Sequence, residues 1–132
     1  MNSDNNHQKN KPILIVEDDK SLAKMYSEKF KIEGFTTVIA EDGEKAINLI
    51  LELNPSFILL DIMLPKFSGL DLLAQIKHNP TTTNIPVIAL TNLAQKEEAQ
   101  KALSLGAKEY LVKAMFTPEE VVDKVKQYLN QK

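Results

Sequence analysis

Five short, unbroken apolar runs constrain the fold of this chain more than any other feature. They are residues 13–16 (ILIV), 37–40 (TVIA), 57–60 (FILL), 87–90 (VIAL) and 110–112 (YLV). A strand with one face in solvent alternates apolar and polar side chains, whereas unbroken apolar runs are typical of strands buried on both faces. Such strands occur in parallel sheets that helices cover on both sides. The chain is therefore predicted to form a parallel sheet.

The segments between these runs have the spacing of amphipathic helices. Apolar residues recur every three or four positions within residues 22–30, 46–53, 70–76, 99–103 and 121–129. Thr117 and Pro118, followed by Glu120, are typical of a helix start with a capping box. Strand and helix thus alternate five times, which predicts a doubly wound α/β domain with a five-stranded parallel sheet and five helices on both faces.

The composition limits the compartment and the partners. The 132-residue chain has 16 basic and 18 acidic side chains and a formal net charge of −2, so direct binding of nucleic acid is not expected. No apolar run reaches the roughly 18 residues of a membrane-spanning segment, so a membrane partner is not expected either. The absence of cysteine excludes disulfides, thiolate catalysis and cysteine-ligated metals. We expect a cytoplasmic domain, residues 12–132, preceded by a disordered polar tail, residues 1–11.

Acidic residues at two strand ends form the first part of a candidate site. Ligands of open parallel sheets bind beyond the carboxyl ends of the strands. The first run is followed by Glu17, Asp18 and Asp19, and the third run is followed by Asp61. If these two strands are neighbours, Asp18, Asp19 and Asp61 share one crevice, where their like charges repel. A hard divalent cation relieves this repulsion, and Mg²⁺ fits better than Zn²⁺ because no cysteine or histidine is near.

Thr91 and Lys113 follow the fourth and fifth runs and complete the candidate site. A lysine that ends an apolar strand needs a nearby anion, unless its amine reaches back to solvent. A metal ion, an ammonium group and a hydroxyl around one carboxylate are the groups that phosphoryl acceptance needs. The positive groups neutralise the transferred oxygens while the carboxylate attacks in line.

Taken together, these residues resemble the receiver domain of two-component response regulators. The resemblance spans about residues 12–130 and rests on the Asp18-Asp19 pair, the segment LLDIMLP around Asp61, Gly69, Thr91, and Tyr110 with Lys113. It implies the flavodoxin-like strand order 2-1-3-4-5. It also implies a switch that phosphorylates and dephosphorylates itself, with Asp61 taking the phosphoryl group from a sensor histidine kinase or a phosphotransfer protein, rather than a turnover enzyme.

The resemblance implies a Mg²⁺ ligand set. Asp19 and Asp61 would bind the ion directly, Asp18 through a water molecule, and Met63 through its backbone carbonyl. This set is an implication of the family pattern and not of the spacing of the residues alone.

The resemblance also assigns the parts of the switch. Lys113 would pair with the phosphoryl group, Thr91 would hydrogen-bond to it, and Tyr110 would change rotamer in response. Residues 95–106 and 109–129 would form the surface that changes and meets a downstream protein target. The protein would be a monomer or a weak, phosphorylation-dependent dimer.

Two positions depart from the family pattern, and two others bear on the lifetime of a phosphorylated form. Ala114 stands where receivers usually have a proline after a cis peptide bond, so this loop is either trans and re-routed or strained. Asn92 stands where a very small residue is usual, which narrows access to the site. In receivers, the positions of Met63 and Leu93 flank the path of the hydrolytic water; by this resemblance their apolar side chains, which carry no group to orient water, predict a long-lived phosphorylated form.

Other interpretations stay open. The length favours a receiver that stands alone, but a receiver cut from a longer regulator has the same features. The two departures also allow a receiver-like interaction module that works without phosphorylation. A phosphatase-like hydrolase would need a second acid where Met63 stands. A flavodoxin-like FMN binder would need a Ser/Thr/Gly-rich phosphate loop in place of residues 17–19, whose charge repels phosphate.

Overall fold

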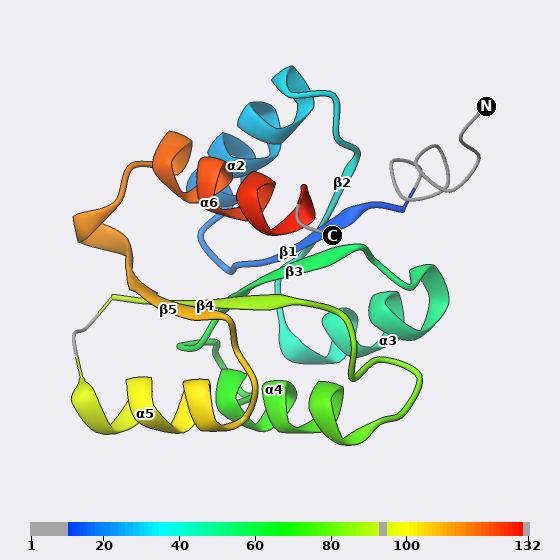
Figure 1. The fold of residues 1–132 in the computed structure, drawn as a ribbon, viewed down its shortest axis with the longest axis vertical. Helices are drawn as coiled ribbons and strands as arrows, with labels where there is room; N and C mark the ends of the chain where they lie inside the picture. Colours follow the sequence, from blue (N-terminus) through cyan, green and yellow to red (C-terminus); the bar gives the residue numbers. More distant parts are fainter. Residues whose placement is uncertain (1–10, 93–94, 131–132) are drawn as a thin grey trace.

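Five parallel strands form one sheet through the centre of the molecule (Figure 1). The computed structural model describes residues 11–92 and 95–130. The strands are β1 (Ile13–Val16), β2 (Thr37–Ala40), β3 (Phe57–Asp61), β4 (Val87–Thr91) and β5 (Glu109–Val112). They pair in the order β2-β1-β3-β4-β5, and every pairing is parallel. The predicted fold class and strand order are confirmed.

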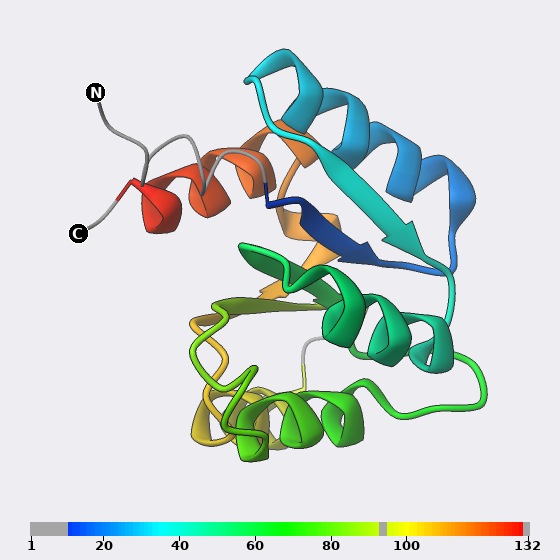
Figure 2. The same cartoon turned by 90° about the vertical axis from the view of Figure 1, so that its right-hand side faces the viewer.

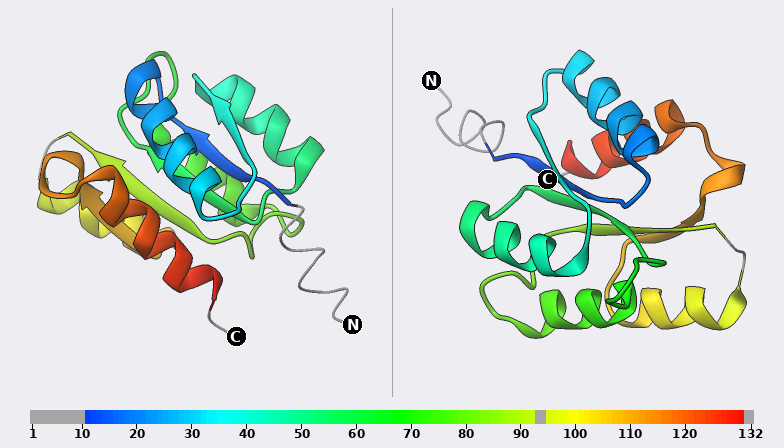
Figure 3. Two further views of the ribbon diagram at one scale, coloured as in Figure 1. Left: turned by 90° about the horizontal axis from the view of Figure 1, so that it is seen from above. Right: turned by 180° about the vertical axis from the view of Figure 1, so that it is seen from behind.

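Helices cover both faces of the sheet. One face carries α2 (Lys20–Ile32) and α6 (Pro118–Leu129), which lie side by side (Figure 3). The other face carries α3 (Gly43–Leu53), α4 (Gly69–His78) and α5 (Lys96–Ser104) (Figures 1 and 2). A short 3₁₀ turn, η1 (Lys113–Met115), follows β5. Within the described part of the chain, none of these helices has the length and apolar character to cross a bilayer.

Each face of the sheet has its own hydrophobic core, because successive side chains of a strand point to opposite faces. Ile13 and Ile15 of β1 pack with residues of α2 and α6, whereas Leu14 and Val16 pack with residues of α3 and α4. All four side chains are almost completely buried. The unbroken apolar run in β1 therefore reflects burial on both sides, as the sequence predicts.

Helix boundaries follow local signals in the sequence. The Thr117 side chain accepts a hydrogen bond from the Glu120 backbone N–H, and the Glu120 side chain accepts one from the Thr117 N–H, which is a complete capping box. Asp19, Asp42 and Ser68 cap α2, α3 and α4 in the simpler way, with one side-chain acceptor each. These caps fix the first residue of α2, α3, α4 and α6, whereas α5 begins without a side-chain cap. The carboxyl ends of the strands lie toward the left of Figure 1.

Candidate functional site

Strand pairing brings acidic residues of β1 and β3 together. Val16 pairs with Leu60, so the same register continued by one residue sets Glu17 beside Asp61. Both residues are 1% exposed. Oxygens from Glu17, Asp18 and Asp61 all lie within 4.8 Å of one another. Within the described ranges, these three residues form the group that could hold a metal ion.

The carboxylate of Asp61 is held at both oxygens. Its Oδ1 accepts a hydrogen bond from the backbone N–H of Met63 at 2.9 Å, and its Oδ2 accepts one from the Lys113 ammonium at 3.0 Å. The same ammonium forms an ion pair with Oε1 of Glu17 at 2.7 Å. The Lys113 side chain is only 11% exposed, so one buried cation serves two buried carboxylates.

The charges of this cluster are not balanced. Burial raises the pKa of Glu17 to about 7; the hydrogen bond with Lys113 opposes this shift, and repulsion by Asp61 adds to it. Burial by itself would lower the pKa of Lys113, but its bonds and charge interactions with Glu17 and Asp61 outweigh burial and raise it. Apart from the ion pair, Glu17 Oε1 has no hydrogen-bond partner in this part of the structure. When all are ionised, three carboxylates and one ammonium leave an excess of two negative charges, which matches a divalent cation.

Asp19 lies outside this carboxylate group, and in this the structure differs from the ligand set that the resemblance implied. Its Oδ1 accepts a hydrogen bond from the Leu22 backbone N–H at 3.1 Å and caps α2. Its own backbone N–H donates to Glu17 Oε2 at 3.1 Å. Thus the acidic pair beside Asp61 is Glu17 with Asp18. The acidic run alone does not single out Glu17, whereas the pairing of residues 13–16 with residues 57–60 places it next to Asp61.

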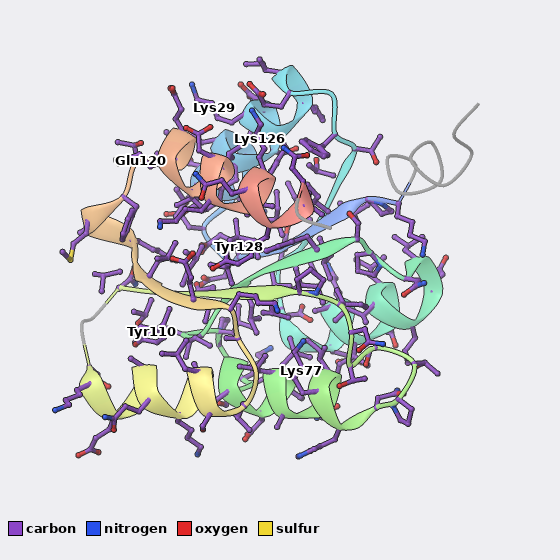
Figure 4. The ribbon with its side chains drawn as sticks, in the orientation of Figure 1. Lys29, Lys77, Tyr110, Glu120, Lys126 and Tyr128 are labelled. Carbon is purple, nitrogen blue, oxygen red and sulfur yellow. The ribbon has the colours of Figure 1, made fainter. Side chains whose placement is uncertain are left out.

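Thr91 and Tyr110 form a hydrogen-bonded path from the site to α5. Thr91 ends β4 and is fully buried. The Tyr110 hydroxyl donates to Oε1 of Glu98 at 3.0 Å, and Figure 4 shows Tyr110 on the α5 side of the sheet. Burial raises the pKa of Tyr110; a hydrogen bond with Thr91 opposes this shift, and the bond to Glu98 adds to it. The tyrosine thus joins a β4 hydroxyl to a carboxylate on a helix.

The positions that depart from the family pattern are only partly described. The peptide bonds of residues 11–92 and 95–130 are trans, so the bond between Lys113 and Ala114 is not cis, and both residues lie in the η1 turn. Asn92 is exposed beside the site. Met63 is 43% exposed, while Leu93 and most of the predicted tail, residues 1–10, lie outside the described residues.

Comparison with known proteins gives a consistent result. Residues 13–126 match the family model of the response regulator receiver domain. The chain is 38% identical over 114 residues to the phosphate regulon transcriptional regulatory protein PhoB of Escherichia coli. The matched segment covers 86% of this chain and 49% of PhoB. It is 34% identical over 119 residues to the DNA-binding response regulator MtrA of Mycobacterium leprae, with 90% and 51% covered. The chain therefore spans about half the length of these curated relatives.

Solved structures agree with the sequence matches. A receiver domain of the Francisella response regulator 1452 superposes with a TM-score of 0.81 at 32% identity, covering 91% of this chain and 97% of that one. The Mn²⁺-bound form of response regulator Rcp1 gives a TM-score of 0.81 at 30% identity, covering 92% and 96%. The family model spans most of the chain, and the fold and the acidic crevice agree with it. This protein belongs to the response regulator receiver domain family.

Proposed function

We propose that this domain is a phosphorylation-dependent signalling switch rather than a turnover enzyme. Asp61 accepts a phosphoryl group from a sensor histidine kinase or a phosphotransfer protein, with Mg²⁺ as the cofactor. One observation carries this proposal: the buried Asp61 carboxylate is fixed by Met63 and Lys113 and lies among two further carboxylates. A purely structural aspartate does not need the buried carboxylate of Glu17 beside it, because buried like charges destabilise the fold, whereas Asp18 is exposed.

The donor set fits a hard divalent cation. Carboxylate and carbonyl oxygens are the ligands that Mg²⁺ prefers, and we propose that Asp18, Asp61 and the backbone carbonyl of Met63 hold it, with Glu17 in the adjoining position. The Mn²⁺-bound form of Rcp1 supports a metal site in a structurally similar receiver. When bound, the ion neutralises negative charge on the phosphoryl oxygens.

In the proposed phosphoryl transfer, Asp61, Lys113 and Thr91 have separate roles. A carboxylate oxygen of Asp61 attacks phosphorus and forms the new O–P bond while the bond from phosphorus to the imidazole nitrogen of the donor breaks. The Lys113 ammonium, already bonded to Asp61, neutralises the incoming oxygens. The Thr91 hydroxyl donates a hydrogen bond to the phosphoryl group. No proton has to be removed from Asp61, because the carboxylate is the nucleophile.

The output follows the path from Thr91 through Tyr110 to Glu98. When Thr91 turns toward the phosphoryl group, its hydrogen bond with Tyr110 is lost, and the Tyr110 rotamer and the position of α5 change with it. The surface of α5, β5 and α6 is therefore the proposed contact for a downstream protein target, and for a weak dimer if phosphorylation produces one. Direct contact with nucleic acid is not proposed for this domain.

A small-molecule phosphoryl donor tests the acceptor. Incubation with Mg²⁺ and acetyl phosphate is expected to add the mass of one phosphoryl group to the wild-type chain and none to Asp61→Asn. Chelation of the metal with EDTA should prevent the gain. An unchanged mass for folded wild-type protein with Mg²⁺ would contradict the proposal, and steady release of phosphate from unrelated monoesters would instead support a hydrolase.

The phosphorylated form is expected to be long-lived without an added phosphatase. Met63 presents an apolar, half-exposed side chain beside Asp61 and offers no hydrogen bond to an attacking water. Met63→Asn should therefore shorten the lifetime, measured as loss of phosphoryl mass after removal of acetyl phosphate. Met63→Leu is the matched control, because it is also apolar and should leave the lifetime unchanged. The prediction is contradicted if the wild type loses its phosphoryl group quickly and Met63→Asn does not change that rate.

A further inference from the structure

Two glycines, Gly69 beside the end of β3 and Gly43 at the start of α3, have no room for a side chain. A Cβ added to Gly69 would lie 2.5 Å from the Cα of Ile62. A Cβ added to Gly43, the first residue of α3, would lie 2.7 Å from Cγ and Cδ1 of the Phe67 ring and 2.8 Å from its Cβ. Both glycines therefore contact the β3–α4 loop, residues 62–68, which lies beside the first turn of α3 in Figure 2. The contact between Gly43 and Phe67 therefore joins α3 to this loop.

The β3–α4 loop is closed on itself by backbone hydrogen bonds. The Gly69 N–H donates to the Ile62 carbonyl at 3.0 Å, and the Phe67 N–H donates to the Pro65 carbonyl at 2.8 Å. Lys66 takes a left-handed conformation with φ of 66°, which turns the chain so that Phe67 packs against the core. Because these hydrogen bonds connect residues near both ends of the loop, a displacement of Phe67 is expected to displace the rest of the loop.

The same loop sets the orientation of the acceptor. The Met63 N–H, four residues before Phe67, donates to Oδ1 of Asp61 at 2.9 Å and is part of what fixes that carboxylate. The Met63 carbonyl is also a proposed metal ligand. A shift of the loop would therefore change both the acceptor geometry and the metal site, although neither Gly43 nor Phe67 contacts Asp61 oxygens in the structure described.

We propose that Gly43 and Phe67 form a clamp that positions Asp61 for metal binding and phosphoryl transfer. The clamp rests on the proposed function, because it acts through Met63 on the acceptor. It needs glycine at position 43: the Phe67 ring seats directly on the helix backbone, and any Cβ there would force the ring away. Gly43 and Phe67 are positioning residues, since they act through the loop.

Gly43→Ala is expected to impair metal binding and phosphorylation although it should not destabilise α3. Alanine favours a helix over glycine, and Asp42 still caps α3 by accepting from the Lys45 N–H at 2.9 Å. Helix propensity alone therefore predicts a neutral or stabilising change that leaves the site unaltered. The clamp predicts that Gly43→Ala weakens Mg²⁺ affinity and slows labelling by acetyl phosphate by roughly tenfold each, as supporting residues of metal sites do.

The test is a double-substitution cycle. Mg²⁺ affinity by calorimetry and labelling rate by mass spectrometry are measured for wild type, Gly43→Ala, Phe67→Ala and the double variant. Phe67→Ala removes the ring atoms that the new methyl group meets but keeps the Phe67 Cβ 2.8 Å away, so the fold-change that Gly43→Ala causes should be clearly smaller in that background than in the wild type. Gly34→Ala is the control, because a Cβ at Gly34 has no neighbour within 4 Å and costs only backbone strain.

The outcomes separate the clamp from the proposed function. The clamp is overturned if Gly43→Ala keeps the Mg²⁺ affinity and the labelling rate of the wild type. It is also overturned if Gly43→Ala lowers both as much in the Phe67→Ala background as in the wild type. In either case the switch function stands. If the wild type neither binds Mg²⁺ nor accepts a phosphoryl group, the function itself fails. Hydrogen exchange of the Met63 amide tests the clamp without either reaction: it should be faster in Gly43→Ala than in wild type, and an equal rate would overturn it.

Discussion

Lys113→Met is expected to lower the free energy of unfolding of the metal-free protein by about 3 kcal/mol above neutral pH. The ammonium serves the buried carboxylates of Glu17 and Asp61, and methionine keeps the length of the side chain but not the charge. Two uncompensated buried carboxylates are then left side by side. Without the lysine, Glu17 loses the hydrogen bond that opposes the burial-raised pKa of its carboxyl, so it binds a proton more tightly in the folded state than in the unfolded state and the loss should grow as the pH rises. Urea unfolding in EDTA measures it.

Lys126→Met is the matched control for this prediction. Lys126 also pairs with a carboxylate, that of Glu33, but the pair lies on the surface between α6 and α2, where water screens it. Its loss should be small and nearly independent of pH. Added Mg²⁺ should raise the melting temperature of Lys113→Met more than that of wild type, because the more negative site binds the ion more tightly. Equal stability of Lys113→Met and wild type would show that the lysine does not balance the site.

Gly69→Ala is expected to cost about 3 kcal/mol or more, because the new methyl group meets backbone atoms that have no room to move. Its Cβ would lie 2.5 Å from the Ile62 Cα and 2.7 Å from the carbonyl oxygens of Ile62 and Asp61. The cost falls directly on the end of β3 that carries Asp61, the proposed acceptor. Denaturant unfolding gives the stability, and labelling with acetyl phosphate should fall with it.

Gly34→Ala separates crowding from backbone strain. Gly34 has φ of 91° after the end of α2, and a Cβ there meets no atom within 4 Å. Only the left-handed conformation is penalised, at about 1 kcal/mol. A cost at Gly69 no larger than the cost at Gly34 would mean that the β3–α4 loop yields easily, contrary to the rigid loop on which the clamp depends.

The sheet could be predicted from the sequence because its three central strands, β1, β3 and β4, are buried on both faces and so have unbroken apolar runs, while the edge strands β2 and β5 keep apolar runs although they are only partly buried. β1, β2, β3 and β4 begin where their runs begin, β5 begins one residue earlier, at Glu109, and β3 and β4 extend one residue further, to Asp61 and Thr91. Asp61 and Thr91 are polar but buried, because they belong to the candidate site and not to the hydrophobic core. Strand order was available only through the resemblance, since nothing in the runs themselves says which strands are neighbours.

The interior of the site was harder to predict. A motif shows that Glu17, Asp18 and Asp19 are acidic, but only the pairing of β1 with β3 shows which of them lie beside Asp61 and which one caps α2. The packing of Phe67 on Gly43 joins residues 24 positions apart and depends on the path of a loop. Contacts of that kind leave no periodic signal in the sequence.

The claim that Asp61 is the acceptor is tested most directly by chemical mapping. Borohydride reduces an aspartyl phosphate to homoserine, which survives digestion with trypsin and peptide sequencing by mass spectrometry. After acetyl phosphate and Mg²⁺, homoserine is expected at position 61, within the tryptic peptide of residues 46–66. Homoserine at position 18, or at any other acidic residue, with position 61 unmodified would contradict the assignment of the acceptor and the function built on it.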